Sequence, residues 1–131
     1  MIFKYMKQGL MYALIIAAGL AVGWGAPRLY EALKPAYKEG DYSTHYAGRH
    51  TNVVVYGTAT CPYCAKTRAY LLERHINFAD LDVTKDEKAR VAFAELGAKA
   101  VPIILVGTRK LEGFNPAALQ SALDAAHPPP H

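Results

Sequence analysis

An uncharged, mostly apolar stretch of about 20 residues separates Lys7 from Arg28. At the helical rise of about 1.5 Å per residue it would measure about 30 Å, which matches the hydrocarbon thickness of a bilayer. Tyr5 lies near its start, and Trp24 and Tyr30 lie near its end, where amphipathic rings suit the headgroup level. The stretch predicts one transmembrane helix. We therefore do not expect this part of the chain to pack in a soluble core.

Two other interpretations fit an apolar N-terminus, namely a cleaved signal peptide and a buried core helix. Small residues at positions 21, 23 and 25 offer a cleavage site, and lysines precede the apolar run. However, the run is long for a signal peptide, and residues 28–34 can continue the helix. We therefore expect a retained anchor over residues 1–34, with residues 8–27 inside the membrane.

The orientation of this anchor is only weakly marked, because similar numbers of basic residues flank its two sides. The very short N-terminal flank favours a cytoplasmic N-terminus, with the rest of the chain on the outer, periplasmic side. The alternative places the rest of the chain on the cytoplasmic face.

Beyond the anchor, the chain divides into three further parts. Residues 35–50 lack periodicity and are rich in Tyr, Gly, Ser, His and charge, which predicts a linker. Residues 51–126 form the predicted domain, and residues 127–131, with three consecutive prolines, a disordered tail. A chain of 131 residues can bury one modest core. Its net charge of +4 forms no basic stripe with interleaved aromatics, so nucleic acid is not an expected partner.

Short apolar runs alternate with helical patterns across this domain. Residues 52–56 are dominated by valine, as in a strand buried on both faces, and Pro62 suits the first position of a helix that runs to about residue 75. In this helix, apolar residues recur at helical spacing at Ala65, Ala69, Leu72 and Ile76.

The remaining predicted elements are a strand over 77–83, a helix between a capping box at Thr84 to Glu87 and Gly97, strands at 102–106 and around 110–111, and a helix from Pro116 capped by Asn115. The resulting order βαβαββα mixes a parallel crossover with an antiparallel hairpin. It predicts an α/β domain with a central four-stranded mixed sheet flanked by helices.

The chain has two cysteines, Cys61 and Cys64, at the junction between the first strand and the first helix. Two cysteines are too few for a disulfide framework, which leaves a redox pair or half of a metal site. If Pro62 is the first helical residue, Cys61 is the cap, and its sulfur faces the unpaired amides of the first turn and the positive end of the helix dipole. Cys64 lies one turn away, where it can displace a mixed disulfide at Cys61.

The helix dipole alone falls short of what a reactive thiol needs. Lowering a thiol pKa by about two units requires roughly 2.7 kcal/mol, whereas the dipole supplies on the order of 0.3 to 2 kcal/mol. Hydrogen bonds from the amide and thiol of Cys64 are the expected supplement, with Lys66 and Arg68 as weaker, solvent-screened contributors.

Two alternatives to exchange remain open for these cysteines. They can be buried packing residues, although their place at a strand-to-helix junction is unusual for that role. They can also bind metal, but the nearest downstream histidine, His75, lies about 16 Å along the helix, so no metal site is expected within one chain. A dimer that holds an iron–sulfur cluster or a soft metal through Cys61 and outside thiols is the second hypothesis.

The segment from Val53 to Cys64, which ends in Cys-Pro-Tyr-Cys, resembles the opening of glutaredoxins, members of the thioredoxin superfamily. Ala100-Val101-Pro102 is similar to the family's Val-Pro pair, and Glu112-Gly113-Phe114-Asn115-Pro116 to its Gly-Phe segment before the last helix. The resemblance implies a thioredoxin fold, with Cys61 as nucleophile and Cys64 as resolving cysteine. It also implies substrate binding by Pro62, Tyr63, Val101, Pro102, Gly113 and Phe114, with Pro102 in the cis form.

The chain departs from many glutathione-dependent members at Gly57, Ala100 and Gly113-Phe114, where those members carry Lys, Thr and a Gly-Gly segment. Its Gly-Phe pattern is more similar to glutaredoxin-like proteins that draw on thioredoxin reductase. The resemblance implies no tightly bound cofactor and either glutathione or a reductase as electron source. The leading hypothesis is a membrane-tethered oxidoreductase that acts on protein disulfides or glutathionylated thiols.

Overall fold

The computed structural model describes residues 1–126, apart from the side chain of Glu31. The chain forms two compact units, the first over Met1–Pro35 and the second starting at Ala36. The tail predicted for residues 127–131 lies outside the described residues.

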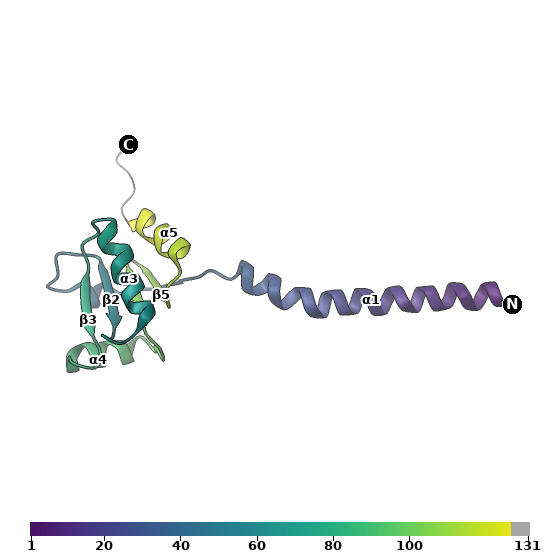
Figure 1. The fold of residues 1–131 in the computed structure, drawn as a ribbon, viewed down its shortest axis with the longest axis horizontal. Coiled ribbons are helices and arrows are strands. Elements are labelled where there is room, and N and C mark those ends of the chain that lie inside the picture. The colour runs from purple at the N-terminus through teal and green to yellow at the C-terminus, as the bar shows by residue number, and fades with distance from the viewer. Residues whose placement is uncertain (127–131) are drawn as a thin grey trace. The chain divides into compact units, whose positions relative to one another are not determined.

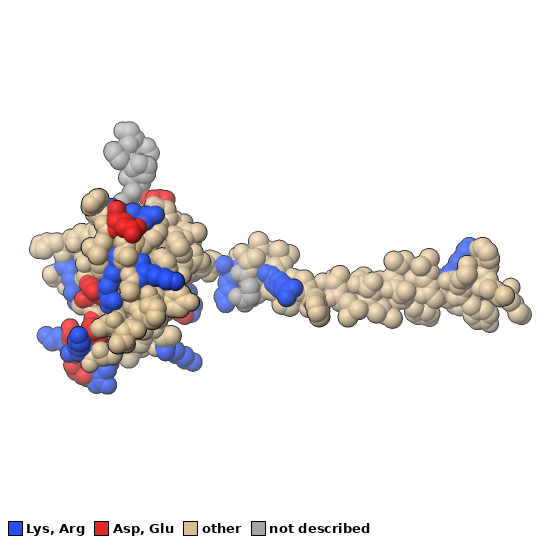
Figure 2. Space-filling view, viewed as in Figure 1, with Lys and Arg blue, Asp and Glu red and all other residues tan. Residues whose placement is uncertain are grey.

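The first unit is a single helix, α1 (Ile2–Leu33). Its segment Ile2–Tyr30 has a mean hydropathy of 1.8 and is long and apolar enough to cross a membrane, by length and composition. Figure 2 shows an uncharged middle with basic side chains toward both ends. The predicted anchor therefore lies on one continuous helix.

The second unit is a mixed sheet with helices on its faces (Figure 1). Strand β2 pairs in parallel with β3 and antiparallel with β4, and β5 pairs antiparallel with β4. The described elements of this unit are β1 (Lys38–Glu39), α2 (Ser43–Tyr46), β2 (Val53–Gly57), α3 (Pro62–Glu73), β3 (Ala79–Asp82), α4 (Glu87–Glu95), β4 (Ile103–Val106), β5 (Arg109–Glu112) and α5 (Pro116–Ala126). From β2 onward this is the predicted βαβαββα order of the thioredoxin fold. Strand β1 adds a fifth strand, in the order β1-β5-β4-β2-β3.

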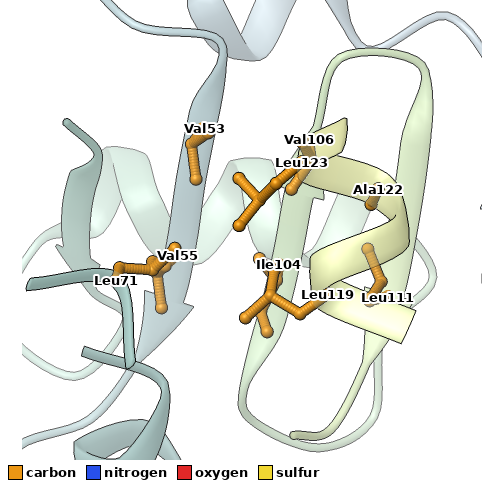
Figure 3. Packing of buried hydrophobic residues seen from close by; sticks show 9 residues of the cluster. All are labelled: Val53, Val55, Leu71, Ile104, Val106, Leu111, Leu119, Ala122 and Leu123. Carbon is orange, nitrogen blue, oxygen red and sulfur yellow. The ribbon is translucent and has the colours of Figure 1, made fainter. Parts of the chain in front are cut away.

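The core has two layers, one on each face of the sheet. Because side chains alternate along a strand, Val53 and Val55 of β2 face α3 and α5, whereas Val54 and Tyr56 face α4. Figure 3 shows the first layer, in which Leu71 of α3 and three residues of α5 close over the strands. All five residues of β2 are buried, so the prediction of a doubly covered strand is confirmed.

Residues 36–50, for which the sequence predicts a linker, are part of the folded unit. Lys38 of β1 pairs with Lys110 of β5, and the Tyr46 hydroxyl donates to the Gly107 carbonyl at 2.9 Å. His45 Nδ1 lies 2.8 Å from the Tyr56 hydroxyl. The physical reason is that aromatic side chains of this segment cover apolar surface on the α4 face of the sheet.

Candidate active site

The two cysteines mark the start of α3, immediately after the loop that follows β2. Pro62 takes the first helical position, where its missing amide hydrogen costs nothing, and Cys61 is the cap. The amide of Cys64 donates to Cys61 Sγ at 3.2 Å. Both cysteines are free thiols, with Cys61 partly exposed and Cys64 fully buried. The predicted cap geometry is therefore confirmed.

Cys61 has the surroundings of a stabilised thiolate. Partial burial disfavours its charged form, but hydrogen bonds from the Cys64 side chain and from the amides of Cys64 and Tyr63 outweigh it and lower the pKa of the Cys61 thiol. When protonated, the same sulfur can donate to the Val101 carbonyl at 3.9 Å. Cys61 is thus both accessible and more acidic than an ordinary thiol.

Cys64 has the opposite character. Burial is the main cause that raises the pKa of its thiol to about 11, and the hydrogen bond to Cys61 and the negative charge of that neighbour add to it. A buried thiol of this kind is poorly suited to attack an outside disulfide. It can still react with Cys61, whose sulfur its own amide contacts.

Lys66 and Arg68, which the sequence predicts to make weaker, solvent-screened contributions to the low pKa of Cys61, differ in their surroundings. Lys66 is exposed, and its Nζ lies 5.2 Å from the centre of the Tyr63 ring. The Arg68 side chain is only 21% exposed, and its Nε donates to the Asp80 carboxylate at 2.8 Å. The Arg68 charge is the smallest of the effects on the pKa of Cys61, as predicted for a weaker contributor, and the chain folds this side chain against β3. Sequence reasoning missed Asp80, although a charged residue in a predicted strand next to the first helix was a usable signal.

The second landmark lies beside the cysteines. The Val101–Pro102 peptide bond is cis, as the resemblance implies, and the Val101 carbonyl faces Cys61 Sγ. The amide of Gly113 donates to the Pro102 carbonyl at 2.9 Å. A groove of about 460 Å³ borders Val101 and Gly113 and is also lined by Lys38, Gly97, Lys99, Ala100 and Glu112. The structure therefore places Cys61 next to the backbone of Val101, which borders this groove.

The remaining predicted site residues have mixed surroundings. Pro62 and Tyr63 are exposed beside Cys61, and Tyr63 is 58% exposed. Phe114 packs against the core layer of α5 and forms an edge-on ring contact with Tyr70, so much of its surface is used in packing. Asn115 Oδ1 accepts from the Ala118 amide at 3.1 Å, which confirms its prediction as a helix cap.

The described part of the chain contains no group of three or more His, Cys, Asp or Glu side chains that could hold a metal ion.

Comparison with known proteins agrees with this geometry. The glutaredoxin family model matches residues 53–110. An uncharacterised glutaredoxin-like 8.6 kDa protein from Clostridium pasteurianum is 34% identical over 73 residues, which cover 55% of this chain and 97% of that protein.

Solved structures show the same fold. The glutaredoxin of Archaeoglobus fulgidus superposes with a TM-score of 0.53 at 23% identity, over 64% of this chain and 97% of that one. The glutaredoxin-like NrdH-redoxin of Escherichia coli has a TM-score of 0.50 at 23% identity, over 60% of this chain and 97% of that one. Because the sequence match is 34% identical and spans nearly the whole clostridial relative, and because the family model covers the segment that contains Cys61 and Cys64, this chain belongs to the glutaredoxin family of thiol oxidoreductases.

Proposed function

We propose that this protein is a membrane-tethered dithiol–disulfide oxidoreductase that reduces protein disulfides or glutathione mixed disulfides through Cys61 and Cys64. The observation that carries the proposal is the contrast between the two sulfurs, one accessible and acidified at a helix cap and the other buried with a raised pKa. The contrast suits Cys61 to the first step of a two-step exchange and Cys64 to the second.

In the first step, the Cys61 thiolate attacks one sulfur of a substrate disulfide. A bond forms between Cys61 Sγ and that sulfur, the substrate disulfide breaks, and the other substrate sulfur leaves as a thiolate. In the second step, Cys64 loses its proton to solvent and attacks Cys61 Sγ. The mixed disulfide breaks, the second substrate thiolate leaves, and Cys61 and Cys64 are oxidised to a disulfide while the substrate has gained two electrons.

Substrate binding would use the backbone beside Cys61. A peptide that carries the target sulfur can hydrogen-bond with Val101, next to Pro102, and contact the exposed ring of Tyr63. Lys99 in the adjoining groove suits a carboxylate of glutathione or of an acidic peptide, whereas Lys38 in the same groove is paired with Glu112 at 3.3 Å. Gly113 lies at the same groove, whereas the ring of Phe114 packs against the core layer of α5.

Two thiol sources can return the disulfide to the dithiol. Glutathione restores it with two thiols, and a thioredoxin-reductase-like enzyme restores it directly. The Gly113-Phe114 pattern, which is more similar to reductase-linked glutaredoxin-like proteins than to glutathione-dependent ones, supports the reductase.

Helix α1 supports the membrane part of the proposal, because it is long and apolar enough to span a bilayer. We place the thiol domain on the periplasmic side. Labelling Cys61 in intact cells with a membrane-impermeant thiol reagent tests this placement, since a periplasmic thiol reacts before lysis. Protection until lysis would place the domain in the cytoplasm.

The activity itself is tested on the reduced full-length protein in detergent micelles. Glutathionylated and disulfide-linked peptides are offered as substrates, first with glutathione and then with a thioredoxin reductase. We expect turnover, and we expect Cys64→Ser to accumulate a mixed disulfide at Cys61 that mass spectrometry detects. Equal turnover by Cys61→Ser and Cys64→Ser would rule out the mechanism. A protein that is coloured by an iron–sulfur cluster and lacks turnover would support the cluster-binding dimer instead.

A further inference from the structure

Arg68 lies on α3 one turn after Cys64, and its side chain is held at two points. Its Nε donates to the Asp80 carboxylate at 2.8 Å, and its Nη1 donates to the Thr58 carbonyl at 3.2 Å. The Arg68 side chain is partly buried, with 21% of its surface exposed. These contacts fix a cation between β3 and the loop that precedes the cysteines.

The space beside Gly57, which has no side chain, shows how close Arg68 lies to the buried sulfur of Cys64. A Cβ built on Gly57 would lie 2.9 Å from Cys64 Sγ and 3.2 Å from Arg68 Nη2. The sulfur and the nitrogen therefore both lie near one point, and the distance between them is at most about 6 Å. Glycine at position 57 leaves the space between them without a side chain.

We propose that Arg68 is a positioning residue for the resolving step, in which its guanidinium stabilises the thiolate of Cys64 as that sulfur displaces the substrate from Cys61. The proposal rests on the proposed function and adds to it a residue that acts on the second step. Asp80 and the Thr58 carbonyl have the supporting role of keeping the guanidinium turned inward.

The resolving step needs such help because Cys64 is buried. Burial raises the pKa of its thiol to about 11, so only a small fraction is ionised near neutrality. The groups that act on this thiol are Cys61 and Arg68 of α3 and the Thr58 backbone, and the carboxylates of Asp80 and Asp82 on β3 act on Arg68. Among these groups Arg68 is the cation, and its charge lowers the pKa of Cys64 and of Cys61.

The two steps differ in how much they need Arg68. In the first step, the amides at the start of α3 and the Cys64 thiol already stabilise the Cys61 thiolate. In the mixed disulfide Cys61 carries no charge, and Cys64 must lose its proton although its side chain is buried. We therefore expect loss of Arg68 to slow resolution more than it slows the first attack.

The test uses the full-length protein in detergent micelles and follows the two steps separately in a single turnover. A fluorescent peptide disulfide reports formation of the mixed disulfide, and release of the second peptide reports resolution. At pH 7, Arg68→Gln should slow resolution by roughly two- to threefold, since a full pKa unit would change the thiolate population tenfold and the Arg68 charge is the smallest of the effects on Cys64. The defect should shrink as the pH rises toward the ionisation of Cys64, and Arg68→Lys should recover part of the rate. Arg90→Gln is the matched control, since Arg90 pairs with Glu87 on the exposed surface of α4.

A second measurement separates this proposal from the proposed function. In the Cys61→Ser background no turnover occurs, and the difference in ultraviolet absorbance from the matching Cys61→Ser/Cys64→Ser variant, in which the tyrosine signal cancels, titrates Cys64. Arg68→Gln should move this titration to higher pH, whereas Arg90→Gln should leave it unchanged. An unchanged Cys64 titration, or a resolution defect of equal size at every pH, would overturn the role of Arg68. Absence of turnover in the wild type would instead count against the proposed function.

Discussion

The N-terminal ends of α3 and α4 are built on the same plan from different atoms. At α4 the Asp86 carboxylate accepts from the amides of Lys88 and Ala89 at 2.9 and 3.3 Å. At α3 the sulfur of Cys61 accepts from the Cys64 amide at 3.2 Å. A carboxylate cap at α4 satisfies orphan amides and does nothing else, whereas a thiol cap at α3 uses the same amides to favour its own ionised form.

The surroundings of the two caps also differ. One neighbour of Cys61 is the buried thiol of Cys64, and another is the carbonyl of Val101. The Asp86 cap is exposed at the surface of the domain. A helix cap therefore becomes a reactive site when the capping atom that accepts the hydrogen bonds can ionise near neutrality and a second reactive group lies next to it.

The largest expected effect is seen when each cap is replaced by serine in a separate variant. Serine is a favoured cap, so Cys61→Ser keeps α3 folded, but its hydroxyl does not ionise near neutrality and all turnover should be lost. Asp86→Ser should retain full turnover with similar stability. Peptide-disulfide turnover and the urea midpoint of both full-length variants check this. Residual turnover in Cys61→Ser would break the comparison, because it would mean that the α3 cap is not the nucleophile.

The next effect tests the packing behind the α3 cap. In Gly57→Ala, the new Cβ would lie 2.9 Å from Cys64 Sγ and 3.2 Å from Cys64 Cβ, so the buried cysteine must shift. We expect a loss of about 1–3 kcal/mol in the free energy of unfolding, typical of an overpacked core, together with slower resolution. Urea unfolding and single-turnover kinetics measure the two effects. Gly23→Ala in α1, where an added Cβ meets nothing within 4 Å, is the control and should leave the domain unchanged.

The Asp86 cap should matter for stability alone. Asp86→Ala removes the acceptor for two amides, and such caps are worth about 1 kcal/mol. The urea midpoint should fall accordingly, while the alkylation rate of Cys61 as a function of pH should not change. A shift in that profile would show that the two helix ends are coupled, contrary to the comparison.

Local rules were enough to predict the α3 cap and its surroundings. The cis Val101–Pro102 bond was expected from the family resemblance, whereas Pro62 at the first helical position and Cys61 as the cap follow from residue types in one short segment. The order of strands and helices from β2 to α5 could be predicted for the same reason, because each element has a periodicity of its own.

Features that depend on distant partners could not be predicted this way. The α4 cap is Asp86 rather than Thr84, whose amide and hydroxyl instead donate to the Asp82 carboxylate. The buried side of α3 is formed by Cys64, Thr67 and Leu71, whereas Ala65, Ala69 and Leu72, which carried the periodicity, are exposed. Residues 36–50 fold only because β5 and the α4 face of the sheet offer them a surface. In each case the local sequence allows more than one conformation of similar free energy, and a tertiary contact selects one of them.

The smallest expected effect is a pH dependence of stability that only the α3 end should produce. The folded state lowers the pKa of Cys61 below the ordinary thiol value of 9.0 and raises that of Cys64 to about 11. As the pH rises toward about 9, the folded chain has already released the Cys61 proton that the unfolded chain still binds, so stability rises. Between about 9 and 11 the unfolded chain releases the Cys64 proton that the folded chain retains, so stability falls.

The stability contributed by the cysteines in the reduced protein should therefore be greatest near pH 9. It is measured as the free energy of unfolding of the wild type minus that of the Cys61→Ser/Cys64→Ser variant, by urea unfolding of the full-length proteins in micelles with reductant. Other groups titrate alike in both proteins and cancel. The corresponding difference between wild type and Asp86→Ser should be flat, because a carboxylate is ionised throughout this range. A flat difference for the cysteine pair would mean that the α3 end, like the α4 end, is only a structural cap, and the basis for its reactivity would be lost.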